Sequence, residues 1–145
     1  MVSIPTPAQA LLGSDAVAHV WTQNPDGSPQ ISVVWCIAHG DEILFGTNAR
    51  SRKVSNIERD PRIILSIEDT ERSERGYQRH LVIRGTATVE PIDVSMLDRM
   101  AEQYTGIAHH PLVERDSPDS VMVRVSIDRI SGVGPWADDE ALQSA

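Results

Sequence analysis

The chain has 145 residues, a length that suits one domain with a substantial core and is too short for two. A hydrophobic content of 40% and a charged content of 23% are typical of globular proteins and exclude a largely disordered chain. The formal net charge of −8 at pH 7 opposes non-specific binding to nucleic acid or to an anionic membrane surface, because their phosphates would be repelled.

No run of apolar residues approaches the roughly 18 that cross a membrane, and the first residues lack the pattern of a secretory signal. The single cysteine, Cys36, permits no internal disulfide, which fits a reducing compartment. We therefore expect a cytoplasmic protein without membrane or nucleic-acid partners.

Side-chain periodicity predicts three helices and six strands. In chain order these are a helix at 5–12, strands at 16–23, 30–38 and 42–47, a helix at 51–59, strands at 62–68 and 80–90, a helix at 93–104 and a strand at 121–130. Strands at hairpin spacing with two intervening helices predict a mostly β fold, a mainly antiparallel barrel of six strands with peripheral helices. We expect a single domain over 1–145, with an N-terminal helix within 1–14 and a flexible tail at 137–145.

A basic cluster lies in the stretch 48–62, which reads NARSRKVSNIERDPR and holds five of the 13 basic residues. Its members are Arg50, Arg52, Lys53, Arg59 and Arg62. Arg52 and Lys53 fall in the first turn of a predicted helix, where unpaired backbone N–H groups and the helix dipole favour anions. This pair predicts a phosphate clamp.

The same cluster has a plainer interpretation, in which its cations cover an exposed helix face and pair with Glu58 and Asp60. Arg59 and Arg62 flank the turn at Asp60-Pro61, and we interpret them as structural. The role of Arg50 stays open.

Other residue types give weaker signals. The five histidines show no metal-ligand spacing, so we expect no metal site, and the His109-His110 pair reads as loop surface without an assigned role. Cys36 is interpreted as a small packed residue rather than a nucleophile. The GxGxxG and GxxxxGK[ST] motifs do not occur, so a cofactor would have to bind in another way.

The tryptophans differ in their surroundings. Trp21 sits in a predicted strand and is expected to pack in the core. Trp136 follows the last predicted strand in SGVGPWADD, among glycines and a proline, where a core residue is not expected. Its indole is a candidate to cover a flat ligand or a partner subunit.

The order of elements and the segment FGTNARSRKVSNIERDPRIILSI together resemble the pyridoxamine 5'-phosphate oxidase-like superfamily of flavin-binding split barrels. The resemblance runs from about 17 to 130. It rests on a strand ending in Thr, an Arg-Lys pair at a helix start, an Asn one turn on, and a DPR before the next strand. It implies a split β-barrel that forms a homodimer and binds FMN or the deazaflavin coenzyme F-420 between its subunits.

The resemblance also implies which residues contact the cofactor. Arg52 and Lys53 match the phosphate-binding pair, and Thr47 matches the strand-end contact before them. In the family, one strand segment lies along the ring system and ribityl chain of the cofactor, and the residues that match it here are Ser32, Val33, Val34 and Trp35. His80 matches a position where relatives place a polar side chain near the cofactor, and it is a candidate proton donor. Trp35 and Trp136 are expected to form pocket walls.

Two departures from the vitamin B6 oxidases shape the expected function. The third helix reads DVSMLDRMAEQYTG and the end reads DRISGVGPWADD, so both substrate elements of those enzymes are missing. The GVGPWA ending and the VVW of the second strand are similar to F-420-dependent reductases. We expect a reductase of a small unsaturated or heteroaromatic substrate that uses F-420. The alternatives are an FMN-binding protein of the same fold and a non-catalytic cofactor-binding protein.

Overall fold

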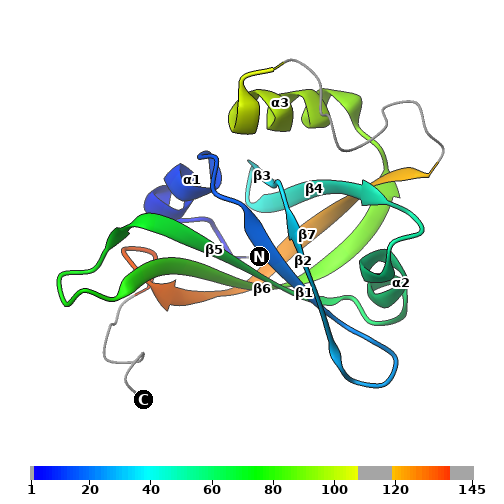
Figure 1. Ribbon diagram of the computed structural model, residues 1–145, viewed down its shortest axis with the longest axis horizontal. Helices are drawn as coiled ribbons and strands as arrows, with labels where there is room; N and C mark the ends of the chain where they lie inside the picture. The colour runs from blue at the N-terminus through cyan, green and yellow to red at the C-terminus, as the bar shows by residue number, and fades with distance from the viewer. Residues whose placement is uncertain (1, 108–118, 138–145) are drawn as a thin grey trace.

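A computed structural model describes residues 2–107 and 119–137. In chain order its elements are α1 (Thr6–Leu12), β1 (Ala18–Gln23), β2 (Pro29–Val34), β3 (Ile37–His39), β4 (Glu42–Asn48), α2 (Arg52–Arg59), β5 (Arg62–Arg72), β6 (Gln78–Pro91), α3 (Val94–Thr105) and β7 (Ser120–Val133) (Figure 1). His109, His110 and the predicted tail beyond 137 lie outside the described residues. None of the described helices has the length and apolar character needed to cross a membrane.

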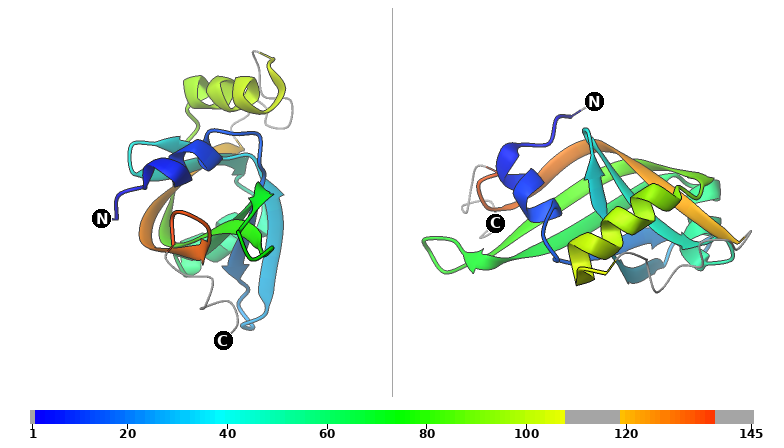
Figure 2. Two further views of the ribbon diagram at one scale, coloured as in Figure 1. Left: turned by 90° about the vertical axis from the view of Figure 1, so that its left-hand side faces the viewer. Right: turned by 90° about the horizontal axis from the view of Figure 1, so that it is seen from above.

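The strands form one sheet in the order β2-β1-β5-β6-β7-β4-β3, and every neighbouring pair is antiparallel. The two edge strands, β2 and β3, are joined by Trp35 and Cys36 alone. Such a connection spans at most about 11 Å between the flanking Cα atoms, because consecutive Cα atoms are about 3.8 Å apart. The two edges of the sheet must therefore lie close together, and the sheet curls into a barrel that stays open between β2 and β3 (Figure 2).

The sequence pattern predicted one strand over 30–38, and the structure divides it into β2 and β3. The prediction of six strands is wrong for this reason, since the described residues form seven. At Trp35 and Cys36 the chain leaves one edge of the sheet and joins the other, which no local pattern reveals. The broader prediction, a mostly β fold with antiparallel strands and peripheral helices, is confirmed.

The barrel interior holds the main hydrophobic core. Side chains that alternate along the strands fill it, as the period of two requires. They include Ala18, Val20, Phe45, Leu65, Ile67, Leu81, Ile83, Val123 and Val125. Helix α1 adds Ala8, Leu11 and Leu12 to the same cluster. The core thus joins the barrel to its N-terminal helix.

Trp136 belongs to this core, with 7% of its surface exposed. Its indole Nε1 donates a hydrogen bond to the backbone oxygen of His80 at 2.9 Å. The expectation that Trp136 lies outside the core is therefore wrong. The chain folds back after β7, and the indole gains both burial and a partner for its polar end.

Helix α3 lies outside the barrel, on the side of β3 and β4 (Figure 1). It begins after Asp93, whose side chain accepts a hydrogen bond from the Met96 N–H, and it ends at Gly106 in a left-handed conformation. A second, smaller cluster packs beneath it and contains Ile37, Leu44, Leu97, Met100 and Met122. This cluster holds α3 beside the opening between β2 and β3.

Candidate functional site

The predicted phosphate clamp lies at the start of α2, just after the end of β4. The chain turns after Asn48, whose side chain accepts the Arg50 N–H at 2.8 Å and whose backbone oxygen accepts the Ser51 N–H at 3.0 Å. Ser51 is the N-cap residue, yet its side chain makes no capping hydrogen bond. Its Oγ atom is buried and has no partner among the described residues. The start of α2 therefore keeps polar groups that a bound anion could satisfy.

The two predicted clamp cations differ in exposure. Arg52 is exposed and Lys53 is half-buried, and burial lowers the pKa of the Lys53 ammonium. Within 2–107 and 119–137, neither forms an ion pair. The plainer interpretation required pairing with Glu58 or Asp60, and that pairing is not seen for these two cations.

The other three cations of the cluster form hydrogen bonds or ion pairs with residues of the same chain. Arg62 binds Asp60 at 2.7 Å, and its hydrogen bonds lower the pKa of the Asp60 carboxyl to about 2. Arg59 donates to the Asn56 side chain at 3.2 Å and to the backbone oxygen of Gln23. These contacts confirm the structural interpretation of Arg59 and Arg62. Arg50 lies 3.5 Å from Asp119 in an exposed ion pair.

Asn56, the Asn one turn after the Arg-Lys pair, holds α2 against the barrel, a role that the sequence analysis did not assign to it. It is fully buried, and its Nδ2 donates to Thr22 Oγ1 at 3.1 Å and to Asn24 Oδ1 at 3.0 Å. The signal that could have identified it is a polar side chain between the buried positions Val54 and Ile57. Through Asn56 the clamp is fixed beside the turn between β1 and β2.

The strand predicted to follow the cofactor begins at this same turn. In β2, Ser32 has a buried Oγ without a described partner, Val33 is 56% exposed, and Val34 packs against the core. Trp35 comes next and is half-buried at the open side of the barrel. From residue 30 to residue 35 an extended chain covers roughly 16 Å, at about 3.3 Å per residue. The four predicted residues thus form a track that leads away from the clamp.

Thr47 lies next to the last residue of β4, close before the clamp in the sequence, and is buried opposite Val121. His80 and Trp136 lie elsewhere. His80 is in β6, separated from β2 by β1 and β5, and its Nδ1 is 3.0 Å from the Gln78 backbone oxygen. Three strand spacings of about 4.8 Å put it roughly 14 Å from β2 along the sheet. Within one chain His80 thus lies three strands from the track, and the Trp136 indole donates to the His80 backbone oxygen.

Tyr104 and Gln103, both in α3, are further residues near the track that the sequence analysis did not single out. The Tyr104 ring stacks on the Trp35 indole, with ring centroids 5.1 Å apart and planes inclined by 11°. Both residues also bond to Cys36, which is buried. Burial raises the pKa of the Cys36 thiol to about 11, which agrees with its interpretation as a packed residue.

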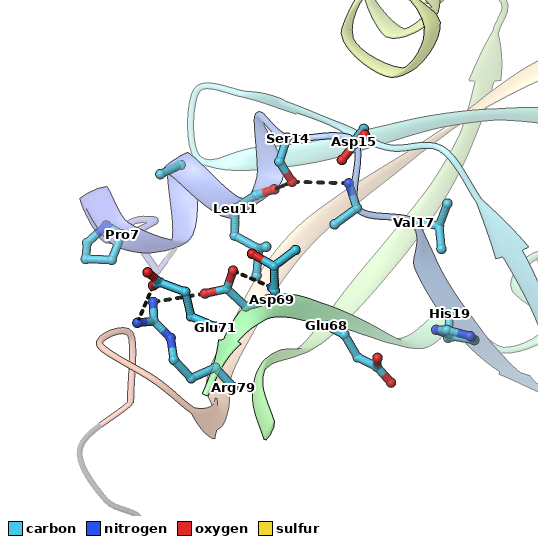
Figure 3. A pocket seen from close by; sticks show the side chains of 13 residues that line it. Pro7, Leu11, Ser14, Asp15, Val17, His19, Glu68, Asp69, Glu71 and Arg79 are labelled. Atoms are coloured by element: carbon cyan, nitrogen blue, oxygen red, sulfur yellow. Dashed lines mark hydrogen bonds and ion pairs between the residues drawn. The ribbon is translucent and has the colours of Figure 1, made fainter. Parts of the chain in front are cut away.

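A cavity of about 760 Å³ opens between α1, the start of β1 and the end of β5 (Figure 3). Four carboxylates line it, from Asp15, Glu68, Asp69 and Glu71. The one cation in its lining, Arg79, is bound by Asp69 at 3.0 Å and by Glu71 at 2.8 Å. The lining repels anions, and none of it belongs to the clamp. Among the described residues, no group of His, Cys, Asp and Glu is placed to hold a metal ion.

Comparison with solved structures gives proteins of the same fold. An F-420 reductase is 26% identical over 88% of this chain and 98% of its own, with a TM-score of 0.72. A conserved hypothetical protein of Mycobacterium tuberculosis is 23% identical over 90% and 84%, with a TM-score of 0.71. The heme storage protein HutZ of Vibrio cholerae is 13% identical over 90% and 95%, with a TM-score of 0.65. The last two show the fold alone.

The curated proteins contain no match to this chain. A family model described as pyridoxamine 5'-phosphate oxidase matches residues 5–134, which include every described strand and all three helices. The match agrees with the split barrel and with the helix start that follows β4. The chain therefore belongs to the pyridoxamine 5'-phosphate oxidase family.

Proposed function

We propose that this protein is an oxidoreductase that binds coenzyme F-420 and reduces a small unsaturated or heteroaromatic molecule. The observation that carries the proposal is the start of α2, where Arg52 and Lys53 form no ion pair with a described residue. The similarity to an F-420 reductase at 26% identity supports the choice of cofactor.

The residues at this helix start fit a phosphate group. The Ser51 Oγ atom is buried without a described partner, and its hydroxyl could donate a hydrogen bond to a phosphate oxygen. Arg52 can add a charge-assisted hydrogen bond. Burial disfavours the charged form of Lys53, and a neighbouring anion would favour it again. The same features suit FMN, which makes FMN the second candidate.

The track on β2 would hold the rest of the cofactor. Val33 would offer an apolar surface on the outward face of β2, Ser32 a hydroxyl on its inward face, and Trp35 an aromatic ring at the far end. When bound, the reduced deazaflavin would supply a hydride, and the substrate would gain this hydride and one proton across its double bond. Solvent or His80 supplies the proton, and the chain's main task is to orient the two reactants and exclude water.

A homodimer completes this proposal. The outer face of β2 exposes Ile31 by 62% and Val33 by 56%, and Val17, just before β1, is 37% exposed. Exposed apolar side chains gathered beside an edge strand are typical of an interface. His80 lies three strands from β2 of its own chain and Trp136 bonds to its backbone, so we assign their predicted contacts to the cofactor of the partner. A cytoplasmic location stays a prediction from the composition.

A non-catalytic role is the remaining alternative. Hydride transfer needs no side chain with strong acid or base character, so an enzyme and a cofactor-binding protein could have the same residues at this site. The test is anaerobic reoxidation of chemically reduced F-420, followed by absorbance, with a panel of enones and quinones. The proposal expects many turnovers per protein with at least one compound. Tight binding without turnover across the panel would favour a binding protein, and turnover with reduced FMN alone would favour the second candidate.

A further inference from the structure

The turn between β1 and β2 lies against the helix that carries the clamp. Asn24, the first residue after β1, accepts a hydrogen bond from Asn56 Nδ2 at 3.0 Å through its Oδ1 atom. Arg59, at the end of the same helix, donates to the backbone oxygen of Gln23. Two residues after Asn24 the turn carries Asp26, which is exposed. An acidic side chain is thus held beside α2.

The Asp26 carboxylate is fixed within its own turn. Its Oδ1 atom accepts a hydrogen bond from the Ser28 N–H at 2.9 Å and another from the Ser28 hydroxyl. Within residues 2–107 and 119–137, no hydrogen bond reaches its Oδ2 atom, and no cation forms an ion pair with it. One oxygen therefore shapes the turn, while the negative charge is not neutralised by a contact.

Arg52 of the clamp faces the same turn. It precedes Asn56 by four residues, and side chains four apart lie on one face of a helix, one turn from each other. The face that bonds to Asn24 through Asn56 therefore carries Arg52 one turn nearer the start of α2. The pKa of the Asp26 carboxyl agrees with this placement, because hydrogen bonds from Ser28 hold it below its usual range and the charge of Arg52 lowers it further.

A carboxylate beside an anion site acts on the charge of the ligand. It weakens the binding of any phosphate held by Arg52, and the repulsion grows in proportion to the charge that the phosphate carries. A phosphate diester, as in F-420, carries one negative charge, whereas a monoester, as in FMN, carries about 1.5 to 2 at pH 7. Asp26 therefore disfavours a monoester more than a diester.

We propose that Asp26 is a specificity-determining residue of the clamp, which favours phosphate diesters over monoesters and thereby F-420 over FMN. The proposal rests on the proposed function, in that the clamp must bind a phosphate. It needs no contact between Asp26 and the cofactor, because a charge acts across several ångströms of water. At roughly 7 Å, each unit of ligand charge corresponds to about a two- to threefold change in Kd.

The test is a fluorescence titration with FMN at low ionic strength, where charges are least screened. The FMN phosphate carries about one negative charge near pH 5 and about two near pH 8, because its second pKa is about 6. Asp26→Asn keeps an oxygen that can accept from Ser28 and removes the charge. We expect this variant to bind FMN about sixfold more tightly than the wild type near pH 8, and about two- to threefold more tightly near pH 5.

F-420 is titrated in parallel near pH 8. Its diester should gain only about two- to threefold in Asp26→Asn, so the preference for F-420 over FMN should fall by about the same factor. Glu74→Gln is the matched control, because it removes one exposed negative charge from the hairpin between β5 and β6, at the other end of the molecule from α2 (Figure 1). It should change each Kd by less than about 1.5-fold.

Two results would overturn the proposal. The first is an Asp26→Asn variant whose Kd values equal those of Glu74→Gln, which would show that the charge at this turn does not reach the clamp. The second is an equal gain for FMN at both pH values, which would show that Asp26 does not discriminate by ligand charge.

Failure of the proposed function gives a different result, in which the wild type binds neither F-420 nor FMN. Inorganic phosphate is then titrated near pH 5 and near pH 8, followed by the amide resonances of Ser51 and Arg52 in 15N NMR. A gain in Asp26→Asn that is larger at the higher pH would still support the role of Asp26, because the phosphate carries more charge there. No shift of these resonances, or a gain that is equal at both pH values, would overturn it.

Discussion

Arg52 and Lys53 stand in the first turn of α2 without an ion pair to a described residue, while Arg59 and Arg62 bond to neighbouring side chains and to the β1–β2 hairpin. The cluster thus divides into cations that hold the helix and cations that are open to a ligand. An exposed ion pair such as that of Arg50 with Asp119 contributes little, about 0–1 kcal/mol. The first-turn pair is where positive charge can act on a bound phosphate.

Removing this pair should weaken cofactor binding. Arg52→Ala with Lys53→Ala is expected to raise the Kd for F-420 at least about tenfold, since a hydrogen bond to a charged group contributes roughly 1.5–3 kcal/mol. The measurement is a fluorescence titration at fixed ionic strength. Arg72→Ala with Arg99→Ala removes two exposed charges from β5 and α3 and is the control for net charge. An equal Kd for the wild type and the first double variant would rule out the clamp.

Single residues were predictable where local spacing decides their role. The position of Arg52 and Lys53 at a helix start follows from the neighbouring sequence. Asn56 depends on Thr22, 34 residues away, and Tyr104 on Cys36, 68 residues away. Such partners are set by the tertiary fold, so neither side chain could be assigned a role from the sequence. The predicted contacts of Ser32 and His80 with a cofactor stay predictions.

The segment GVGPW, residues 132–136, includes the last two residues of β7 and the turn that follows them. Gly132 and Gly134 have positive φ angles of 105° and 149°. A Cβ on Gly132 would collide with the His80 backbone oxygen, and one on Gly134 would lie 2.5 Å from Trp136 Cζ2. These glycines let the chain turn back so that the Trp136 indole packs into the core and bonds to His80. Local glycines had indicated an exposed loop, and a contact across 56 residues makes the indole buried instead.

Gly134→Ala tests this element. The added Cβ would displace the indole and break its hydrogen bond, so we expect a loss of about 3 kcal/mol in the free energy of unfolding. Gly40→Ala is the control, because Gly40 also has a positive φ of 61° and has no atom within 4 Å of an added Cβ. It should lose about 1 kcal/mol from backbone strain alone. Urea denaturation followed by tryptophan fluorescence measures both, and equal losses would contradict the packing role.

The division of the predicted strand 30–38 is the main point at which periodicity failed for an element. Alternation continues through Trp35, and neither glycine nor proline interrupts it. The break is imposed by closure of the sheet, because β2 and β3 belong to opposite edges. The break has a structural consequence, since it leaves the Cys36 backbone to bond with α3 and places Trp35 against Tyr104.

At the scale of the whole molecule, the residues predicted to contact a cofactor lie on separate parts of one chain. The clamp and the track lie on α2 and β2, while His80 and Trp136 lie on and beyond β6 and β7. The exposed side chains of Ile31 and Val33 lie on the outer face of β2. A second copy that covers this face would hide apolar surface and bring the missing residues toward the track.

Light scattering on a sizing column should therefore find a dimer at micromolar concentration. Ile31→Glu with Val33→Glu would bury like charges at the proposed interface and should give a monomer that keeps its β-sheet circular dichroism. Ile107→Glu, at an isoleucine that is 49% exposed next to the end of α3, should stay dimeric. A monomeric wild type would contradict the shared site.

The most direct measurement is an equilibrium titration of the wild-type protein with F-420 and with FMN, side by side at the same ionic strength. We predict saturable binding of F-420 with a Kd at least about tenfold lower than that for FMN, a difference of roughly 1.4 kcal/mol. Tighter binding of FMN would contradict the assignment to F-420, and no saturable binding of either molecule would contradict a cofactor site at the start of α2.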